Sequence, residues 1–360
     1  MNFKENQMAK VTNRIEWVDL ARVLAILCVV LCHCTEAVYR FDVDYMSTLS
    51  LKANLFSCSL MTFGRFGVPI FLMISGYLLL DRNYDKIKTY KFWNKTKHLV
   101  ICALFWAVIG ELFVIYVLHS NVTWDSAFFS IIFLKTFDMN HFWYLPMIIG
   151  MYVLIPFVSH ALKEFDLDTI FKATIFFAVL AYLVPFVISI LNFWGYSGLT
   201  LEVSLGFSGG KYGIYMVVGY LIKKGYFKKY KSYGLAILMV ITFIVYVLIQ
   251  VYLFQNGFKL RNYYDSPFLF VAAICLFELI SRIEHVRFYR IIQPMAIYAF
   301  AVFLIHNFVK MYLKDSILSM AVSNFYKFVM LYAVVIVLSY ILAIVISKIP
   351  KFGKYILYLK

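Results

Sequence analysis

Apolar runs of about 20 residues recur along the whole chain, and short polar or basic segments separate them. A run of this length is what an α-helix needs to cross the hydrocarbon core of a bilayer. The pattern therefore predicts an all-α polytopic membrane protein with about ten transmembrane helices. The predicted spans have the approximate limits 17–38, 59–80, 98–118, 142–161, 170–191, 211–222, 233–254, 266–281, 293–313 and 326–348.

Two segments depart from this regular pattern. The predicted span at 211–222 is short. The stretch from Thr123 to Phe137 is rich in Phe and Ile but carries Trp124, Asp125 and Lys135, so we expect an interfacial helix there and not a span. No Gly/Ser-rich or Pro-rich linker divides the chain, which predicts a single membrane domain over residues 1–360.

Composition agrees with this assignment, because 63% of the residues are hydrophobic and only 15% are charged. Soluble chains carry about 25% charged residues. With the N-terminus inside, about 22 Lys and Arg residues fall in inside loops and about 6 fall outside. This asymmetry predicts that both termini are cytoplasmic and that the protein is a multi-pass protein of the cell membrane. The outside residues are Arg40, Lys52, Lys135, Lys259, Arg261 and Lys314. The inside residues include Lys4, Lys10, Arg14, the run 82–97, the cluster 223–231, three arginines from 282 to 290 and the C-terminal lysines.

The net charge of +15 therefore has an explanation in membrane topology. The basic residues lie at span ends, so we expect no nucleic-acid partner. Some of these basic residues are also suited to bind a CoA or nucleotide substrate at the inner face.

The first predicted span contains Asp19, Arg22 and His33. A charge in hydrocarbon costs several kcal/mol, so such residues are functional candidates by default. Arg22 and His33 are eleven residues apart, which is three helical turns plus about 20° and roughly 16 Å along the axis. One helix face thus carries a cation at the inner end and an imidazole toward the outer end. The alternative for Asp19 and Arg22 is an ion pair in which they only neutralise each other. Packing alone is a poor explanation for His33, because burying a polar ring without a partner costs free energy.

The remaining polar residues within spans share the outer half of the membrane. Because successive spans alternate in direction, each position can be given a depth, and a common depth predicts one chamber. His141 is equally explained as an interfacial residue, His306 as a buried histidine bonded to a backbone carbonyl, and Glu111 as a structural partner of Arg65 or another base. The residues expected in the outer half are His33, Glu36, Arg65, Glu111, His141 and His306.

The six cysteines give no clear metal signal. Cys28 and Cys32 lie one turn apart beside His33, but no second ligand cluster with zinc spacing follows. Cysteine in an apolar run behaves as a small hydrophobe. We therefore expect packing roles and no metal.

Four segments, in this order, resemble the membrane acyltransferase-3 family: EWVDLARVLAILCVVLCHC, GRFGVPIFLMISGYLLL, HFWYLPMIIGMYVLIP and YAFAVFLIHNF. The first is similar to the family pattern of an Arg, ten residues and a His. The second is similar to its Gly-Val-Pro and Ser-Gly-Tyr element. The third and fourth resemble its aromatic-rich fourth span and its penultimate span ending in His. Together with the span count, the resemblance covers nearly the whole chain.

Within the family, the chain is most similar to the stand-alone branch that includes the O-acetyltransferase of enterobacterial common antigen. We expect no appended esterase-like domain, since the chain ends about 12 residues after the last predicted span. The chain departs from the family in two places. The segment PMIIGMY stands where many members have an acidic residue and glutamines, so acceptor handling can differ. Leu24 stands where a Gly often follows the Arg, which bears on packing.

The resemblance implies transfer of an acyl group, most simply acetyl, from cytoplasmic acyl-CoA to a hydroxyl of a cell-envelope or exported carbohydrate. Arginine suits phosphate because its donors match phosphate oxygens, and His33 can act as general base or take the acyl group itself. Other classes remain open: a polysaccharide or small-anion exporter, or a non-catalytic accessory protein. The expected donor-binding residues are Asp19, Arg22 and Arg65, the expected catalytic residues are His33, Glu36 and His306, and the substrate-side candidates are Glu111 and His141.

Overall fold

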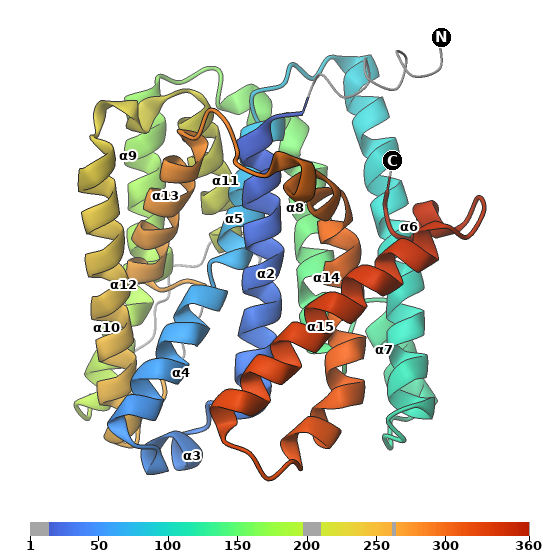
Figure 1. Cartoon of the computed structure of the whole chain (residues 1–360). Coiled ribbons are helices and arrows are strands. Elements are labelled where there is room, and N and C mark those ends of the chain that lie inside the picture. The colour runs from blue at the N-terminus through green and yellow to red at the C-terminus, as the bar shows by residue number, and fades with distance from the viewer. Residues whose placement is uncertain (1–13, 197–209, 261–263, 360) are drawn as a thin grey trace.

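The computed structural model describes residues 14–196, 210–260 and 264–359, and these residues form helices and connecting loops without a strand (Figure 1). A 3₁₀ turn, η1 (Asn140–Trp143), precedes α8, and a π-helical turn (Val179–Leu183) joins α9 to α10. A second 3₁₀ turn, η3 (Tyr226–Lys229), follows α11. The helices are α2 (Glu16–Tyr39), α3 (Val43–Thr48), α4 (Leu51–Gly64), α5 (Gly67–Leu79), α6 (Lys86–Tyr116), α7 (Trp124–Ile131), α8 (Tyr144–Ala161), α9 (Leu167–Ala178), α10 (Val184–Phe193), α11 (Gly210–Lys223), α12 (Ser232–Gln255), α13 (Pro267–Ser281), α14 (Tyr289–Leu318), α15 (Asn324–Ser347) and α16 (Gly353–Ile356).

All ten predicted span ranges are helical, and the all-α polytopic class is confirmed. Eight helical segments of the described chain are long and apolar enough to cross a membrane. The other two predicted spans are α11 and α13, with 14 and 15 residues. At 1.5 Å per residue they are about 21–23 Å long, less than the ~30 Å hydrocarbon core. The stretch expected to hold an interfacial helix contains α7, with 8 residues. Four residues of the charge count, Lys4, Lys10, Arg261 and Lys360, lie outside the described residues.

The second predicted span consists of two helices in line, α4 and α5, which meet at Arg65 and Phe66. The break packs closely against α2. A Cβ on Gly64 would lie 2.6 Å from the backbone nitrogen of Cys32, and a Cβ on Gly67 would lie 2.6 Å from the carbonyl oxygen of Ala25. Only glycine permits this approach, so the break has a fixed place beside α2.

Helix α5 also packs backbone to backbone against α11. A Cβ on Gly76 would overlap the carbonyl group of Met216, and a Cβ on Gly219 would overlap that of Met73. Small residues allow such close contacts between membrane helices. In Figure 1, α5 and α11 lie on the same side of the molecule as the start of α2, and α4 lies toward the opposite side.

Helix α2 lies in the centre of the bundle, with α4, α5, α14 and α15 packed against it. Helix α15 crosses obliquely in front of α2 and α14, and α6 lies at one edge of the bundle (Figure 1). Helix α6 makes its contacts through α7, α8, α14 and α16. The helix that carries Asp19, Arg22 and His33 is therefore the one most enclosed by protein, which lets its polar groups find protein partners.

Candidate active site

Three histidines from distant parts of the sequence lie together, and we call them the histidine cluster: His33 on α2, His141 in η1 and His306 on α14. Their ring centroids are 5.4 Å apart for His33 and His306, 5.0 Å for His141 and His306, and 6.4 Å for His33 and His141. His141 and His306 are buried, with exposures of 1% and 0%. The sequence predicted only a shared depth for these residues, and the structure places them in ring contact.

Hydrogen bonds fix how two of the rings are oriented. His306 Nδ1 lies 2.8 Å from the carbonyl oxygen of Phe303 and 3.1 Å from that of Val302. Carbonyl oxygens only accept, so Nδ1 carries the proton and Nε2 keeps its lone pair. His141 Nδ1 lies 3.1 Å from the amide nitrogen of Asn307, which only donates, so in the neutral ring Nε2 carries the proton. Neither Nε2 has a hydrogen-bond partner within the described residues. The cluster therefore offers one acceptor and one donor to a ligand.

His33 has an acidic neighbour on its own helix. Its Nδ1 lies 3.7 Å from Glu36 Oε2, which is longer than a hydrogen bond but close enough for an electrostatic contact. Glu36 and Arg65 line the same small pocket, and the Arg65 guanidinium lies over the ring of Tyr264, 5.2 Å from its centroid. Two of the predicted site residues, Glu36 and Arg65, thus lie together beside His33.

Sequence reasoning missed two polar residues on α14, Asn307 and Lys310. Asn307 is 3% exposed and orients His141. Lys310 lies one turn after His306, and its charge acts on both His33 and Glu36. The signal was present as the four-residue spacing from His306 to Lys310, which places both side chains on one helix face.

Glu111 lies apart from these contacts. It is buried on α6 near Asp138, and its carboxylate oxygens accept no hydrogen bond from the described residues. The hydrogen-bonded pairing with Arg65 that the sequence suggested is therefore not formed. Within the described chain, no group of His, Cys, Asp and Glu has an arrangement that could hold a metal ion.

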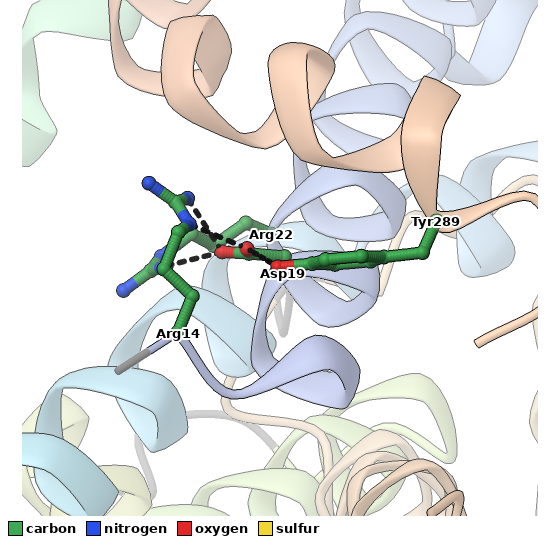
Figure 2. Close-up of polar contacts among 4 residues, drawn as sticks. All are labelled: Arg14, Asp19, Arg22 and Tyr289. Atoms are coloured by element: carbon green, nitrogen blue, oxygen red, sulfur yellow. Dashed lines mark hydrogen bonds and ion pairs between the residues drawn. The ribbon is translucent and has the colours of Figure 1, made fainter. Parts of the chain in front are cut away.

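At the start of α2, Asp19 is fully buried and accepts four hydrogen bonds from three residues (Figure 2). Arg14 donates from Nε and Nη2, both at 2.8 Å, and Arg22 donates from Nη1 at 2.7 Å. The hydroxyl of Tyr289 donates at 2.8 Å. The hydrogen bond to Asp19 raises the pKa of Arg14, so Arg14 stays charged. The Asp19–Arg22 pair is thus present, and one carboxylate positions two guanidinium groups with one positive charge in excess.

A cavity of about 1100 Å³ begins at these arginines. It lies among α2, α5, α6, α8 and α14, and its volume is slightly above the ~300–1,000 Å³ typical of small-molecule sites. No Asp or Glu is among its lining residues, and we call it the basic cavity. Its six basic lining residues are Arg14, Arg22, Arg82, Lys88, Lys91 and Lys95.

The other end of the basic cavity lies next to the histidine cluster. Val29, one turn before His33, lines it together with Tyr144 and Phe303. The Phe303 ring lies 5.3 Å from that of Tyr144 and 5.5 Å from that of His141. The cavity therefore leads from Arg22 to an aromatic wall in contact with the cluster. Of the predicted donor-binding residues, Arg22 lines the cavity, Asp19 holds Arg22, and Arg65 lies beside Glu36 instead.

The segment around α16 completes one wall of the basic cavity through Tyr358 and Leu359. Its anchor is the carbonyl oxygen of Ile356, which accepts from Trp106 Nε1 at 2.7 Å and from Cys102 Sγ at 2.9 Å. The ring of His98 stacks on Tyr355, with the centroids 4.0 Å apart. These contacts tie the segment to α6, some 250 residues earlier in the sequence.

Fold and site together define a polytopic helical membrane protein with a buried histidine cluster at the end of a large basic cavity. A family model described as an acyltransferase domain matches residues 15–348, and the chain belongs to this family, acyltransferase-3. The resemblance predicted from four sequence segments is thereby confirmed at the level of the family, and the protein is a multi-pass membrane acyltransferase. No curated protein and no solved structure matches the chain.

Proposed function

We propose that the protein is an O-acyltransferase that moves an acyl group, most simply acetyl, from cytoplasmic acyl-CoA to a hydroxyl of a cell-envelope or exported carbohydrate. One observation carries the proposal: the basic cavity extends from a set of six cations to an aromatic wall in contact with the histidine cluster. Acyl-CoA has the matching polarity, with phosphates at one end and a thioester at the other. Its pantetheine arm has about the length of the roughly 16 Å that separate Arg22 from His33 along α2.

Arg22 is the proposed anchor for the pyrophosphate. One of its nitrogens is held by Asp19, and the guanidinium has further N–H donors for phosphate oxygens. Because Asp19 is buried and also binds Arg14 and Tyr289, the anchor has a fixed position before the donor arrives. Preorganisation of this kind reduces the entropic cost of binding.

His33 is the proposed general base. It takes the proton of the acceptor hydroxyl as that oxygen bonds to the thioester carbonyl carbon. The carbon–sulfur bond then breaks, and the CoA thiolate leaves and takes the proton from the imidazolium. Glu36 supports the charged imidazole, and His141 Nε2–H is suited to donate to the oxyanion.

A second route keeps the same residues. The His33 nitrogen attacks the thioester first, the CoA thiolate leaves with the ring proton, and an acyl-imidazole forms. The acceptor hydroxyl then takes the acyl group and returns a proton to the ring. The two routes differ in whether an acylated protein accumulates when the acceptor is absent, which labelled acetyl-CoA reveals.

The proposed acceptor is a lipid-linked or exported glycan that reaches the histidine cluster from the outer face. The likeness to the stand-alone branch with the O-acetyltransferase of enterobacterial common antigen supports such an acceptor. The Lys/Arg asymmetry of the loops supports a cytoplasmic donor side.

The deciding experiment incubates purified protein in detergent with labelled acetyl-CoA, with and without lipid-linked glycan extracted from envelope membranes. We expect release of CoA and label in the glycan for the wild type, and loss of both for His33→Ala. An exporter would transport glycan without turning over acetyl-CoA, and that outcome would reject the proposal.

A further inference from the structure

The end of the basic cavity that lies farthest from the histidine cluster has a basic stripe on α6. Lys88, Lys91 and Lys95 follow a spacing of three and four residues, which places them on one face of the helix. All three line the cavity together with Arg82, from the loop before α6. All four side chains are solvent-exposed and line one cavity that has no Asp or Glu in its lining, so they present positive charge to an anionic ligand that enters there.

The cations of the cavity differ in how far protein acids neutralise them. Asp19 pairs with Arg14 and Arg22, and Asp85 pairs with Lys88 at 3.1 Å. Lys91 and Lys95 form no ion pair with any described residue, and the Arg82 Nε donates to the backbone oxygen of Leu78. The uncompensated charge of the cavity is therefore concentrated at Arg82, Lys91 and Lys95.

Aromatic side chains lie next to these cations. Tyr84 and Tyr358 both line the cavity, and the Tyr358 hydroxyl donates to the carbonyl oxygen of Lys95 at 3.3 Å. Phe92 lies beside Tyr84, with the ring centroids 5.4 Å apart. Aromatic faces beside uncompensated cations are the combination that binds a nucleotide, because the base stacks while the cations hold the phosphate.

We propose that Lys91, Lys95 and Arg82 form a subsite for the 3′-phosphate of the CoA adenosine, so that the protein selects intact CoA thioesters over donors that lack this group. The inference rests on the proposed acyl-CoA donor and adds a second anionic subsite to it. With the pyrophosphate at Arg22, the 3′-phosphate lies farther from the thioester, on the side of the α6 stripe. A phosphate monoester carries close to two negative charges and therefore matches the uncompensated cations.

The test compares binding of CoA and dephospho-CoA to the full-length protein in detergent by isothermal titration calorimetry. The variant is Lys91→Gln/Lys95→Gln, and the matched control is Lys86→Gln/Lys97→Gln, two lysines of the same helix that do not line the cavity. We expect the wild type and the control to bind CoA about 10- to 100-fold more tightly than dephospho-CoA, as two charge-assisted contacts imply. The variant should lose most of this preference, because only Arg82 of the subsite remains, and its affinity for dephospho-CoA should equal that of the wild type.

The nucleotide that lacks the 3′-phosphate also reports on folding, since its affinity should not change in the variant. Equal affinity of the wild type for both nucleotides, or a preference that is not reduced in the variant, overturns the subsite and leaves the acyl-CoA donor in place. Absence of binding for both nucleotides overturns the donor assignment and the subsite together.

Discussion

The residues of the histidine cluster have different roles because different partners hold them. His306 donates its Nδ1 proton to backbone carbonyl oxygens, and His141 Nδ1 accepts a hydrogen bond from Asn307. His33 instead has an acidic side chain nearby and is partly accessible, with 16% of its side chain exposed. His33 is therefore the ring that can gain and lose a proton with least rearrangement, and the other two are suited to orient substrate and stabilise charge.

We expect His33→Ala to reduce acyl transfer by about 10²- to 10⁴-fold, the usual cost of a lost acid/base. His306→Ala should leave a measurable remainder. The rate of transfer from excess acetyl-CoA in membranes measures both. His160→Ala, an exposed histidine on α8, is the matched control. If His33→Ala transfers acyl groups at the wild-type rate, with normal abundance and melting temperature, His33 has only a packing role.

Arg22→Lys should raise the apparent KM for acyl-CoA by about 10-fold or more while abundance stays normal. A lysine ammonium can keep the ion pair with Asp19, but it cannot hold the carboxylate and a phosphate with a rigid planar fork of donors. Arg290→Lys, close to the Tyr289 that binds Asp19, is the matched control. An unchanged KM in Arg22→Lys would mean that Arg22 serves only to neutralise Asp19.

At the scale of elements, interrupted and short helices build the region beside α2. Helices α4 and α5 meet at a break, and α11 and α13 are too short for a full span. Irregular backbone at membrane depth is tolerated where protein covers it or where it lines a cavity. The close contact of α5 with α11 fixes the α5 wall of the basic cavity.

Gly219→Ala should destabilise the protein by about 1–3 kcal/mol or more, because the new methyl group overlaps the backbone of Met73 and overpacking is costly. Gly234→Ala is the control, since nothing lies within 4 Å of its Cβ position and alanine is the better helix former. Thermal unfolding in detergent should show a lower midpoint for the first and an equal or higher one for the second. Equal midpoints for Gly219→Ala and the wild type would show that α5 and α11 can separate freely.

The sequence predicted the helical ranges because apolar runs of membrane length report directly on spans. It did not predict that the second span begins at Leu51, since Lys52, Asn54 and Ser57 interrupt the apolar run. The structure shows why this polar start is tolerated: the amide of buried Asn54 donates to the carbonyl oxygen of Met46 at 2.9 Å. A bond of this kind depends on how α3 and α4 pack, which hydropathy does not report.

The candidate site was predictable in part for the same reason. Residues in apolar runs stand out, so His33, His141 and His306 were found, but their mutual contact depends on packing across more than 100 residues of sequence. Asn307 and Lys310 were missed because they resemble the polar end of a span. The wall formed by Tyr358 has no local sequence signal, since contacts with α6 alone define it.

At the scale of the whole molecule, the proposed mechanism makes the basic cavity the donor side and the region beyond the histidine cluster the acceptor side. The division has a function only if the chain has the orientation that the Lys/Arg asymmetry predicts. All six cysteines are buried, which gives a low background for thiol labelling of introduced cysteines.

Cysteine replacements at Ser120 and Lys259 should react with an impermeant thiol reagent applied outside intact cells, and replacements at Lys88 and Lys229 should react only after the membrane is opened. Both Lys88 and Lys229 are exposed in the structure, so lack of reaction reports on the side of the membrane and not on burial. Labelling of the Lys229 replacement from outside would reverse the donor and acceptor sides.

The basic cavity draws its lining from both ends of the described chain, from Arg14 before the first span to Leu359 after the last. During biosynthesis, Arg14 and Arg22 emerge from the ribosome more than 300 residues before Tyr358. A nascent chain halted before α16 contains Asp19 and its two arginines but lacks the cavity wall that Tyr358 and Leu359 form. The basic cavity is therefore complete only after α16 has been made and has docked on α6, so partly inserted chains lack the complete site that we propose for acyl-CoA.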